Sequence, residues 1–150
     1  MPATYFLAEL DCPVCGSRSP ADESTELVTP LVSGGPTFWT VGESDPEFNW
    51  ATIAVWYPVL KVPQPGEPEQ LLETWVCPAC GSLAWARITF DDTVIKEITA
   101  VPLDLPTVGA AHAISSEIEP VYREITGKNL FTDRSDRTGF RDRLLDALRR

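Results

Sequence analysis

Every cysteine of this 150-residue chain lies in one of two short motifs that share the pattern Cys-Pro-x-Cys-Gly. Each motif predicts a tight turn that presents two thiolates on one side of the backbone, with the glycine able to take the left-handed conformation that closes the turn. Two such turns facing each other supply four sulfur ligands in the tetrahedral arrangement that structural zinc prefers, and iron is the chemical alternative. The sequence therefore predicts one metal site, zinc in the first instance, with the ligands Cys12, Cys15, Cys77 and Cys80.

Disulfides and a redox function fit the two motifs less well than metal binding does. A thioredoxin-like redox pair stands at the start of a helix that follows a strand. Here both motifs are followed by polar or strand-forming residues, at 17–20 and 82–85. Residues 1–10 contain no basic stretch followed by an apolar run, which is typical of a protein without a signal peptide. We therefore expect a cytoplasmic protein, in which paired cysteines serve as metal ligands.

The two motifs resemble the knuckles of the zinc-ribbon, or rubredoxin-like, group of proteins. The resemblance covers residues 12–16 and 77–81 together with the strands expected beside them. It implies a metal ion held between two β-hairpins, and it implies nothing about activity. The chain departs from a minimal ribbon in its spacing, because 61 residues separate Cys15 from Cys77. The family cannot supply a role for this insert.

The expected fold is mainly β with C-terminal helices, in the α+β class. The 14 prolines and 9 glycines favour many short strands and turns over a helical bundle. We expect a zinc-ribbon β domain in residues 1–111, with an inserted β region in residues 17–74. A helical extension is expected to follow in residues 112–150.

Runs of β-branched and aromatic residues predict short strands, at residues 4–10, 27–32, 38–41, 51–60 and 71–76. Residues 83–90 and 94–101 predict a hairpin joined at Asp91-Asp92-Thr93. On its first arm the more apolar face, which is expected to meet the core, consists of Ala84, Ala86, Ile88 and Phe90. The proline-rich residues 62–69 predict an extended loop, and residues 102–111 predict a crossing segment.

Two helices are expected in the C-terminal extension. The first is short, begins near Ser116 or Glu119 and ends near Gly127. The second begins at Ser135 or Asp136 and carries an apolar stripe on one side. The stripe consists of Phe140, Leu144, Leu145 and Leu148, and the other faces carry Arg141, Arg143, Arg149 and Arg150.

Charge is distributed unevenly along the chain, whose formal net charge is −10. Residues 1–120 contain 17 acidic and 4 basic residues, a net −13, whereas residues 121–150 contain 5 and 8, a net +3. An acidic body repels phosphate, so nucleic-acid binding is disfavoured. The same body attracts cations, which favours a basic protein as the partner.

Five tryptophans are many for a chain of this length. Most of them are expected to fill the core of a thin β domain. The alternative is that the three in the insert line a groove for a partner, among acidic side chains that would steer a cationic ligand. The residues of this expected binding surface are Trp39, Glu43, Asp45, Glu47, Trp50 and Trp56.

Catalytic motifs are missing from the sequence. His112 is the only histidine, which excludes a multi-histidine site, and a closed four-sulfur site leaves no open position for water or substrate. No phosphate-binding loop and no nucleophile elbow occur. No apolar run approaches the length of a membrane span.

The sequence is therefore interpreted as a non-enzymatic, bacterial-type, zinc-stabilised protein-interaction module. We expect it to bind a basic protein, as an inhibitor, an immunity-like factor or an assembly adaptor. A nucleic-acid-binding zinc ribbon and an iron-bearing electron-transfer protein are the alternatives. The first would have to use the basic C-terminus, and the second would need iron at the four cysteines.

Overall fold

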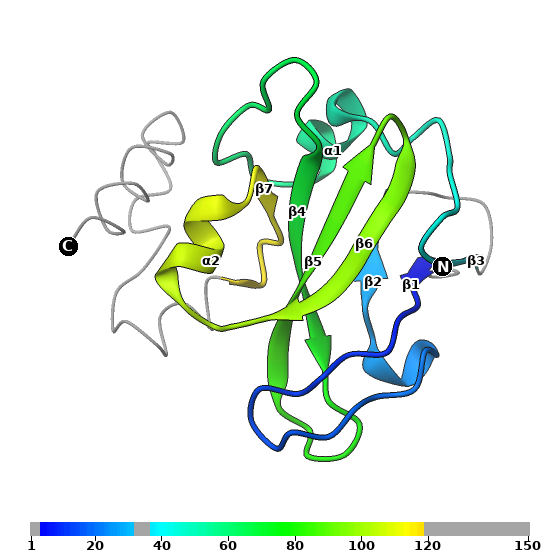
Figure 1. The fold of residues 1–150 in the computed structure, drawn as a ribbon, viewed down its shortest axis with the longest axis vertical. Helices are drawn as coiled ribbons and strands as arrows, with labels where there is room; N and C mark the ends of the chain where they lie inside the picture. Colours follow the sequence, from blue (N-terminus) through cyan, green and yellow to red (C-terminus); the bar gives the residue numbers. More distant parts are fainter. Residues whose placement is uncertain (1–3, 32–36, 119–150) are drawn as a thin grey trace.

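The computed structural model describes residues 4–31 and 37–118. Their strands form two sheets (Figure 1). The first sheet has the order β2-β1-β3 and comprises β1 (Thr4–Phe6), β2 (Val28–Thr29) and β3 (Thr37–Trp39). The second has the order β6-β5-β4-β7 and comprises β4 (Glu69–Val76), β5 (Leu83–Asp91), β6 (Val94–Val101) and β7 (Ala113–Ile114).

Helical structure is minor in these residues. It consists of the 3₁₀ turn η1 (Glu23–Thr25) and the helices α1 (Trp50–Trp56) and α2 (Leu105–Ala110). The prediction of a mainly β protein is confirmed for the described residues. The two helices expected near the C-terminus fall largely in residues 119–150, outside the described residues.

Strands β4, β5 and β6 form the central frame of the molecule, and β4 and β5 extend further than β6 toward the cysteine turns (Figure 1). The β4–β5 pairing is uninterrupted from Val76↔Leu83, next to the second cysteine motif, to Glu69↔Phe90 at the other end. The predicted hairpin of residues 83–90 and 94–101 is confirmed. Its two central turn residues, Asp92 and Thr93, both have positive φ, 52° and 66°, as a twist-matched two-residue turn requires. The second motif and this turn therefore lie at opposite ends of the frame.

The main core lies between the two sheets. Ala84, Ala86, Ile88 and Phe90 are fully buried, which confirms the face predicted to meet the core. Phe90 belongs to an aromatic cluster with Phe6 of β1 and Phe48 of the loop before α1, with ring centroids 5.1–6.1 Å apart. Rings at these distances and tilts add attraction beyond the burial of their apolar area.

A second, smaller core lies on the opposite face of the four-stranded sheet. Trp85 points there from β5 and is 1% exposed. Helix α2 contributes Val108, and β7 contributes Ile114. Both faces of the sheet are covered at this level, which explains why Ala84, Trp85 and Ala86 are buried consecutively rather than alternately.

The prediction of a strand at residues 51–60 is wrong, because α1 occupies residues 50–56. The Asn49 side chain accepts a hydrogen bond of 3.0 Å from the backbone N–H of Thr52 and caps the helix. Ile53 and Tyr57, four residues apart, are buried against the main core. Tertiary burial of one helical face thus overrides the β propensity of Thr52, Ile53 and Val55.

Replacement of Asn49 by alanine is expected to lower the free energy of unfolding by about 1 kcal/mol, because one N–H of the first turn of α1 loses its acceptor. Urea denaturation followed by circular dichroism measures the change. Asn49→Asp is the matched control, since a carboxylate caps equally well. An alanine variant as stable as the wild type would show that the cap contributes nothing.

The prediction of a crossing segment without helix in residues 102–111 missed a short helix. They contain α2, which Asp104 caps by accepting a hydrogen bond of 2.9 Å from the N–H of Thr107. Pro106 lies in the first turn of α2, where its missing N–H costs nothing. Pro106, which argues against a helix when the sequence is considered alone, is therefore compatible with the first turn of α2.

Candidate metal centre and acidic surface

The two cysteine motifs fold into turns with the same hydrogen bonds. In the first, the N–H of Cys12 donates to the carbonyl of Ser17 (2.9 Å), and the N–H of Gly16 donates to the carbonyl of Cys12 (2.9 Å). In the second, the N–H of Cys77 donates to the carbonyl of Ser82 (3.0 Å), and the N–H of Gly81 donates to the carbonyl of Cys77 (2.8 Å). Gly16 and Gly81 have φ of 77° and 74°, the left-handed conformation that glycine adopts without strain.

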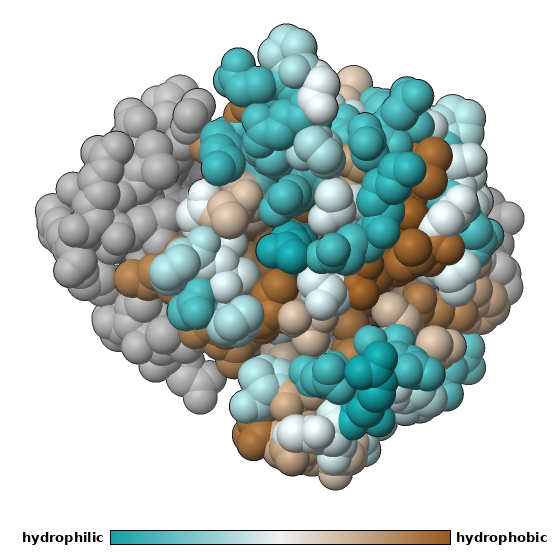
Figure 2. All heavy atoms as spheres, viewed as in Figure 1, coloured by the Kyte–Doolittle hydropathy of each residue, from teal (hydrophilic) through white to brown (hydrophobic). Residues whose placement is uncertain are grey.

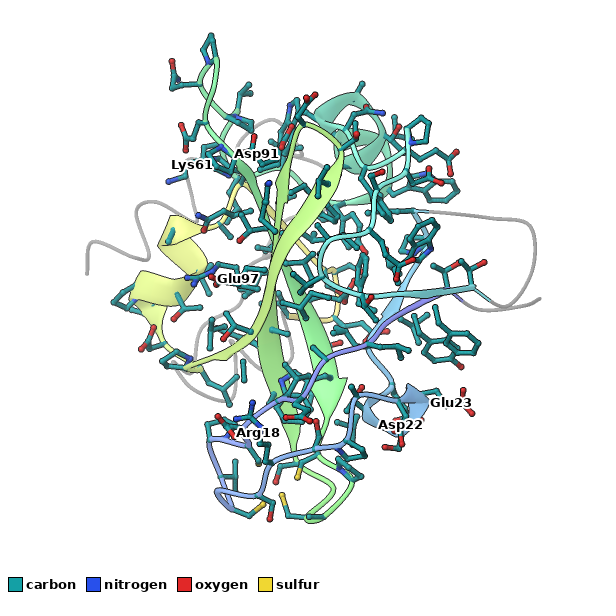
Figure 3. All side chains as sticks on the ribbon, turned by 45° about the vertical axis from the view of Figure 1, so that its right-hand side comes forward. Arg18, Asp22, Glu23, Lys61, Asp91 and Glu97 are labelled. Atoms are coloured by element: carbon teal, nitrogen blue, oxygen red, sulfur yellow. The ribbon has the colours of Figure 1, made fainter. Side chains whose placement is uncertain are left out.

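The four sulfur atoms gather at one end of the molecule, where Figure 3 shows them in yellow below Arg18. Sγ of Cys12 lies 3.7 Å from Sγ of Cys80, and Sγ of Cys15 lies 3.7 Å from Sγ of Cys77. All four sulfur atoms lie within 4.8 Å of one another. Tetrahedral zinc with bonds of about 2.3 Å places its sulfur ligands about 3.8 Å apart. The residues therefore fit a four-cysteine metal site, and the separations are far longer than a disulfide bond.

Hydrogen bonds within the turns favour the thiolate form that binds metal. The hydroxyl and the backbone N–H of Ser17 lower the pKa of Cys15 to about 6. Ser82 lowers the pKa of Cys80 in the same way. Sγ of Cys12 accepts hydrogen bonds of 3.4 Å from the N–H groups of Val14 and Cys15. Such N–H···S contacts stabilise sulfur that carries negative charge.

Burial divides the cysteines into an inner and an outer pair. Cys12 and Cys77 are buried, whereas Cys15 and Cys80 are exposed. Four sulfur ligands complete a tetrahedral shell and leave no open coordination position. The chemistry that this arrangement supports is therefore structural, joining the N-terminal segment to the β4–β5 hairpin.

Comparison with known proteins found no matching family model, no matching curated protein and no matching solved structure. Separately, none of the helices in the described residues combines the length and apolar character needed to cross a membrane.

Acidic side chains gather at the end of the frame opposite the sulfur atoms, where Figure 3 labels Asp91. The loop before α1 runs along the β5–β6 turn, with the N–H of Ile95 donating to the carbonyl of Glu43 (2.9 Å) and the N–H of Asp45 donating to that of Thr93 (3.2 Å). Glu69 reaches the same place because it pairs with Phe90. We call this surface the acidic end; its carboxylates are Glu43, Asp45, Glu47, Glu69, Asp91 and Asp92.

The carboxylates of the acidic end form no ion pair with any residue that the structure describes. Arg18 pairs with Glu9 and Asp11, and Arg87 pairs with Glu97. Lys61, which Figure 3 labels near Asp91, and Lys96 of β6 form no ion pair with the six carboxylates. Desolvation raises the pKa of Glu69, and the charges of Asp91 and Asp92 add to the shift. Mutual repulsion of this kind falls when a cation approaches.

The three tryptophans of the insert have different surroundings. Trp39 is half-buried and contacts Phe48 edge-on, with ring centroids 5.1 Å apart. Trp50 is half-buried and contacts the ring of His112 edge-on. Trp56, at the end of α1, is 57% exposed, and its neighbour Val55 is 78% exposed. Of the three, Trp56 offers the largest apolar surface to a partner.

The sequence analysis missed a buried carboxyl group in the main core. Glu73 of β4 is 5% exposed. It accepts hydrogen bonds from the Tyr57 hydroxyl (2.7 Å) and from the N–H of Thr74 (3.0 Å), and the Tyr57 hydroxyl lies 2.7 Å from that of Thr29. Desolvation raises the pKa of Glu73 to about 7. Its alternation with Leu71 and Trp75 on one face of β4 is the sequence signal that predicts this burial.

His112 is buried and both of its ring nitrogens have partners. Nδ1 accepts a hydrogen bond of 3.0 Å from the N–H of Gln70, so the proton lies on Nε2, which donates to Glu67 (2.6 Å). The carbonyl of His112 accepts from Leu60. These contacts fix the proline-rich loop and β7 to β4, which is a structural role.

Proposed function

We propose that this protein is a zinc-stabilised interaction module, with a zinc-ribbon-like core, that binds a basic protein partner through its acidic end. The observation that carries the proposal is the acidic end itself, whose loop of Glu43 and Asp45 leads into α1, the helix on which Val55 and Trp56 are exposed. Charge at such a surface steers a cationic partner, and exposed aromatic side chains supply the buried contacts that hold it.

The surface of the described residues supports the same assignment. Figure 2 shows hydrophilic residues over the upper part of the molecule, which contains the acidic end. Brown, hydrophobic residues are more frequent in the middle of this view. Rim charges of this kind raise the association rate more than they raise affinity.

The metal centre contributes stability to this module and takes no part in chemistry. Zinc is the ion proposed, because a set of four cysteine ligands in two knuckles is typical of structural zinc. A closed shell gives neither a water nucleophile nor a substrate position, so the module is proposed to have no enzymatic activity.

Replacement of Trp56 by alanine is expected to weaken binding of a basic partner about tenfold, because an exposed anchor is lost while the core is untouched. The measurement is isothermal titration with a short helical peptide that carries lysine on one face and leucine on the other, called the cationic probe below. Affinity of the wild type is also expected to fall between about 0.15 M and 0.5 M salt, where charge is screened over a shorter distance.

Phe38→Ala is the matched control, because Phe38 is an aromatic side chain of similar exposure on the other sheet. It should bind the cationic probe like the wild type. Binding that is unaffected by salt, or equal loss of affinity in both variants, would contradict the proposal.

A further inference from the structure

The cysteine cluster combines exposed and buried sulfur in a pattern that bears on its reaction with oxidants. Each motif contributes one buried cysteine, Cys12 or Cys77, and one exposed cysteine, Cys15 or Cys80. Both sulfur contacts of 3.7 Å join an exposed cysteine to a buried cysteine of the other motif, Cys80 to Cys12 and Cys15 to Cys77. Cysteines that react with oxidants are typically exposed thiolates with a second cysteine beside them. The cluster contains this arrangement twice.

The exposed cysteines are accessible to a small oxidant in the form that reacts. The thiolate, and not the thiol, is the nucleophile, and a bound metal ion keeps a coordinating cysteine deprotonated. The Ser82 hydroxyl lies 3.2 Å from Sγ of Cys80, from where it can donate a hydrogen bond to a thiolate. Because Cys15 and Cys80 are exposed and the other two cysteines are buried, hydrogen peroxide reaches the exposed pair first.

We propose that the cluster is a peroxide-reactive site, which hydrogen peroxide converts into two disulfides between the motifs, Cys15–Cys77 and Cys12–Cys80. In the first step an exposed thiolate attacks one peroxide oxygen, the O–O bond breaks, and a sulfenic acid and a hydroxide ion form. In the second step the neighbouring buried thiolate attacks the sulfenic sulfur, so that the S–S bond forms and a second hydroxide ion leaves.

The electrons and atoms of this reaction balance. Each disulfide consumes one peroxide, which takes two electrons from two thiolates, and the two hydroxide ions become water by taking protons from the solvent. A metal ion held by the four sulfur atoms loses its thiolate ligands and is released. The reaction needs no protein partner, so the inference goes beyond the proposed function.

The geometry favours disulfides between the motifs over disulfides within them. Each turn is fixed by its own hydrogen bonds, among them those from Gly16 to Cys12 and from Gly81 to Cys77. A disulfide within one turn must draw its two sulfur atoms together against this backbone. A disulfide between turns needs a separation of 3.7 Å to close to about 2.05 Å, which a small approach of the two turns supplies. The oxidised protein therefore keeps the N-terminal segment attached to the β4–β5 hairpin after the metal has left.

The test treats the full chain, loaded with zinc, with hydrogen peroxide and maps its disulfides by mass spectrometry after digestion with trypsin. Trypsin releases the first two cysteines in residues 1–18 and the last two in residues 62–87. We expect these two peptides to stay joined until a reductant is added, while non-reducing electrophoresis of the intact protein shows a monomer. Peptides that run separately without reductant, or cysteines that enter no disulfide, would overturn the proposal.

The same digest identifies the partners of each cysteine. Fragmentation at the bonds before Pro13 and Pro78 separates the two cysteines of each peptide. The expected pairs are Cys15–Cys77 and Cys12–Cys80, and the pairs Cys12–Cys77 and Cys15–Cys80 would contradict the proposal. Dimedone, which traps sulfenic acid, should label the exposed cysteines during the reaction, and a label on the buried pair alone would contradict the proposed first step.

Thermal unfolding tests whether the disulfides replace the link that the metal provides. The oxidised, metal-free protein should melt about 10 °C above reduced protein from which a chelator has removed the zinc, because a disulfide between the motifs closes a long loop. Disulfides within the motifs close loops of only a few residues, so equal melting temperatures would overturn the proposal. As the control, reduction of the oxidised protein and return of zinc should restore the original melting temperature, since disulfide formation is reversible.

Discussion

A Cys77→Ser variant is expected to lose its metal and to unfold at a much lower temperature than the wild type. Cys77 is a buried member of the four-cysteine cluster, and its loss would leave three sulfur atoms and remove a link between the N-terminal segment and the β4–β5 hairpin. Structural zinc contributes about 10 kcal/mol or more to small domains, and this chain, which has a core of its own, should lose about 4 kcal/mol or more. Thermal unfolding and elemental analysis give the two measurements.

Ala79→Ser is the matched control, since it changes an exposed residue of the same turn without touching a ligand. It should melt within a few degrees of the wild type and retain one zinc per chain. A Cys77→Ser variant with an unchanged melting temperature would show that the cluster does not stabilise the fold. A wild-type protein that carries iron and absorbs visible light would replace zinc by iron in the proposal.

Replacement of Glu73 by glutamine is expected to stabilise the protein at pH 8, by about 2 kcal/mol. The pKa of Glu73 rises from its ordinary value of 4.5 to about 7 because burial disfavours the ionised form. The folded state therefore binds more protons than the unfolded state between these pH values, and stability falls as the pH rises through that window. A full shift of this size corresponds to about 3 kcal/mol, from which imperfect hydrogen bonding of the amide is subtracted.

The hydrogen bonds around residue 73 can adapt to an amide. An amide N–H can donate to the Tyr57 oxygen, and the Tyr57 hydroxyl can then donate to Thr29, whose Oγ1 already accepts from Leu31. Urea denaturation from pH 5.5 to 8 provides the measurement, with Glu117→Gln as a control that removes an exposed carboxylate nearby. A pH slope that is identical in the Glu73→Gln variant and the wild type would refute the assignment.

The clustering of the four cysteines and the sheet frame could be predicted because their signals are local. The turn between Cys77 and Ser82 fixes the pairing of Val76 with Leu83, and the same register carries Glu69 to Phe90 at the far end. The approach of Glu69 to Asp91 could therefore have been derived from the sequence by extending that register.

Helix α1 and the hydrogen-bond partners of Glu73 could not be predicted from local patterns, because both depend on contacts between residues distant in sequence. The β-branched residues of 50–56 favour a strand by local propensity. The helix forms because it lets Ile53 and Tyr57 bury against the same core. Glu73 follows two leucines in β4. Its burial is possible because the Tyr57 hydroxyl, which also contacts Thr29, donates a hydrogen bond to it, and both partners are distant in sequence. Local patterns contain neither contact.

The unequal construction of the two knuckles has a consequence for the order of folding. The second knuckle closes a hairpin between adjacent strands, and such hairpins form in about 1–10 μs. The first knuckle must return across the 61 residues that separate Cys15 from Cys77, so its arrival carries a larger loop-closure entropy. An ion present during folding would meet Cys77 and Cys80 first as a two-sulfur chelate. Capture by Cys12 and Cys15 would then be the step that locks the N-terminal strand against the sheet.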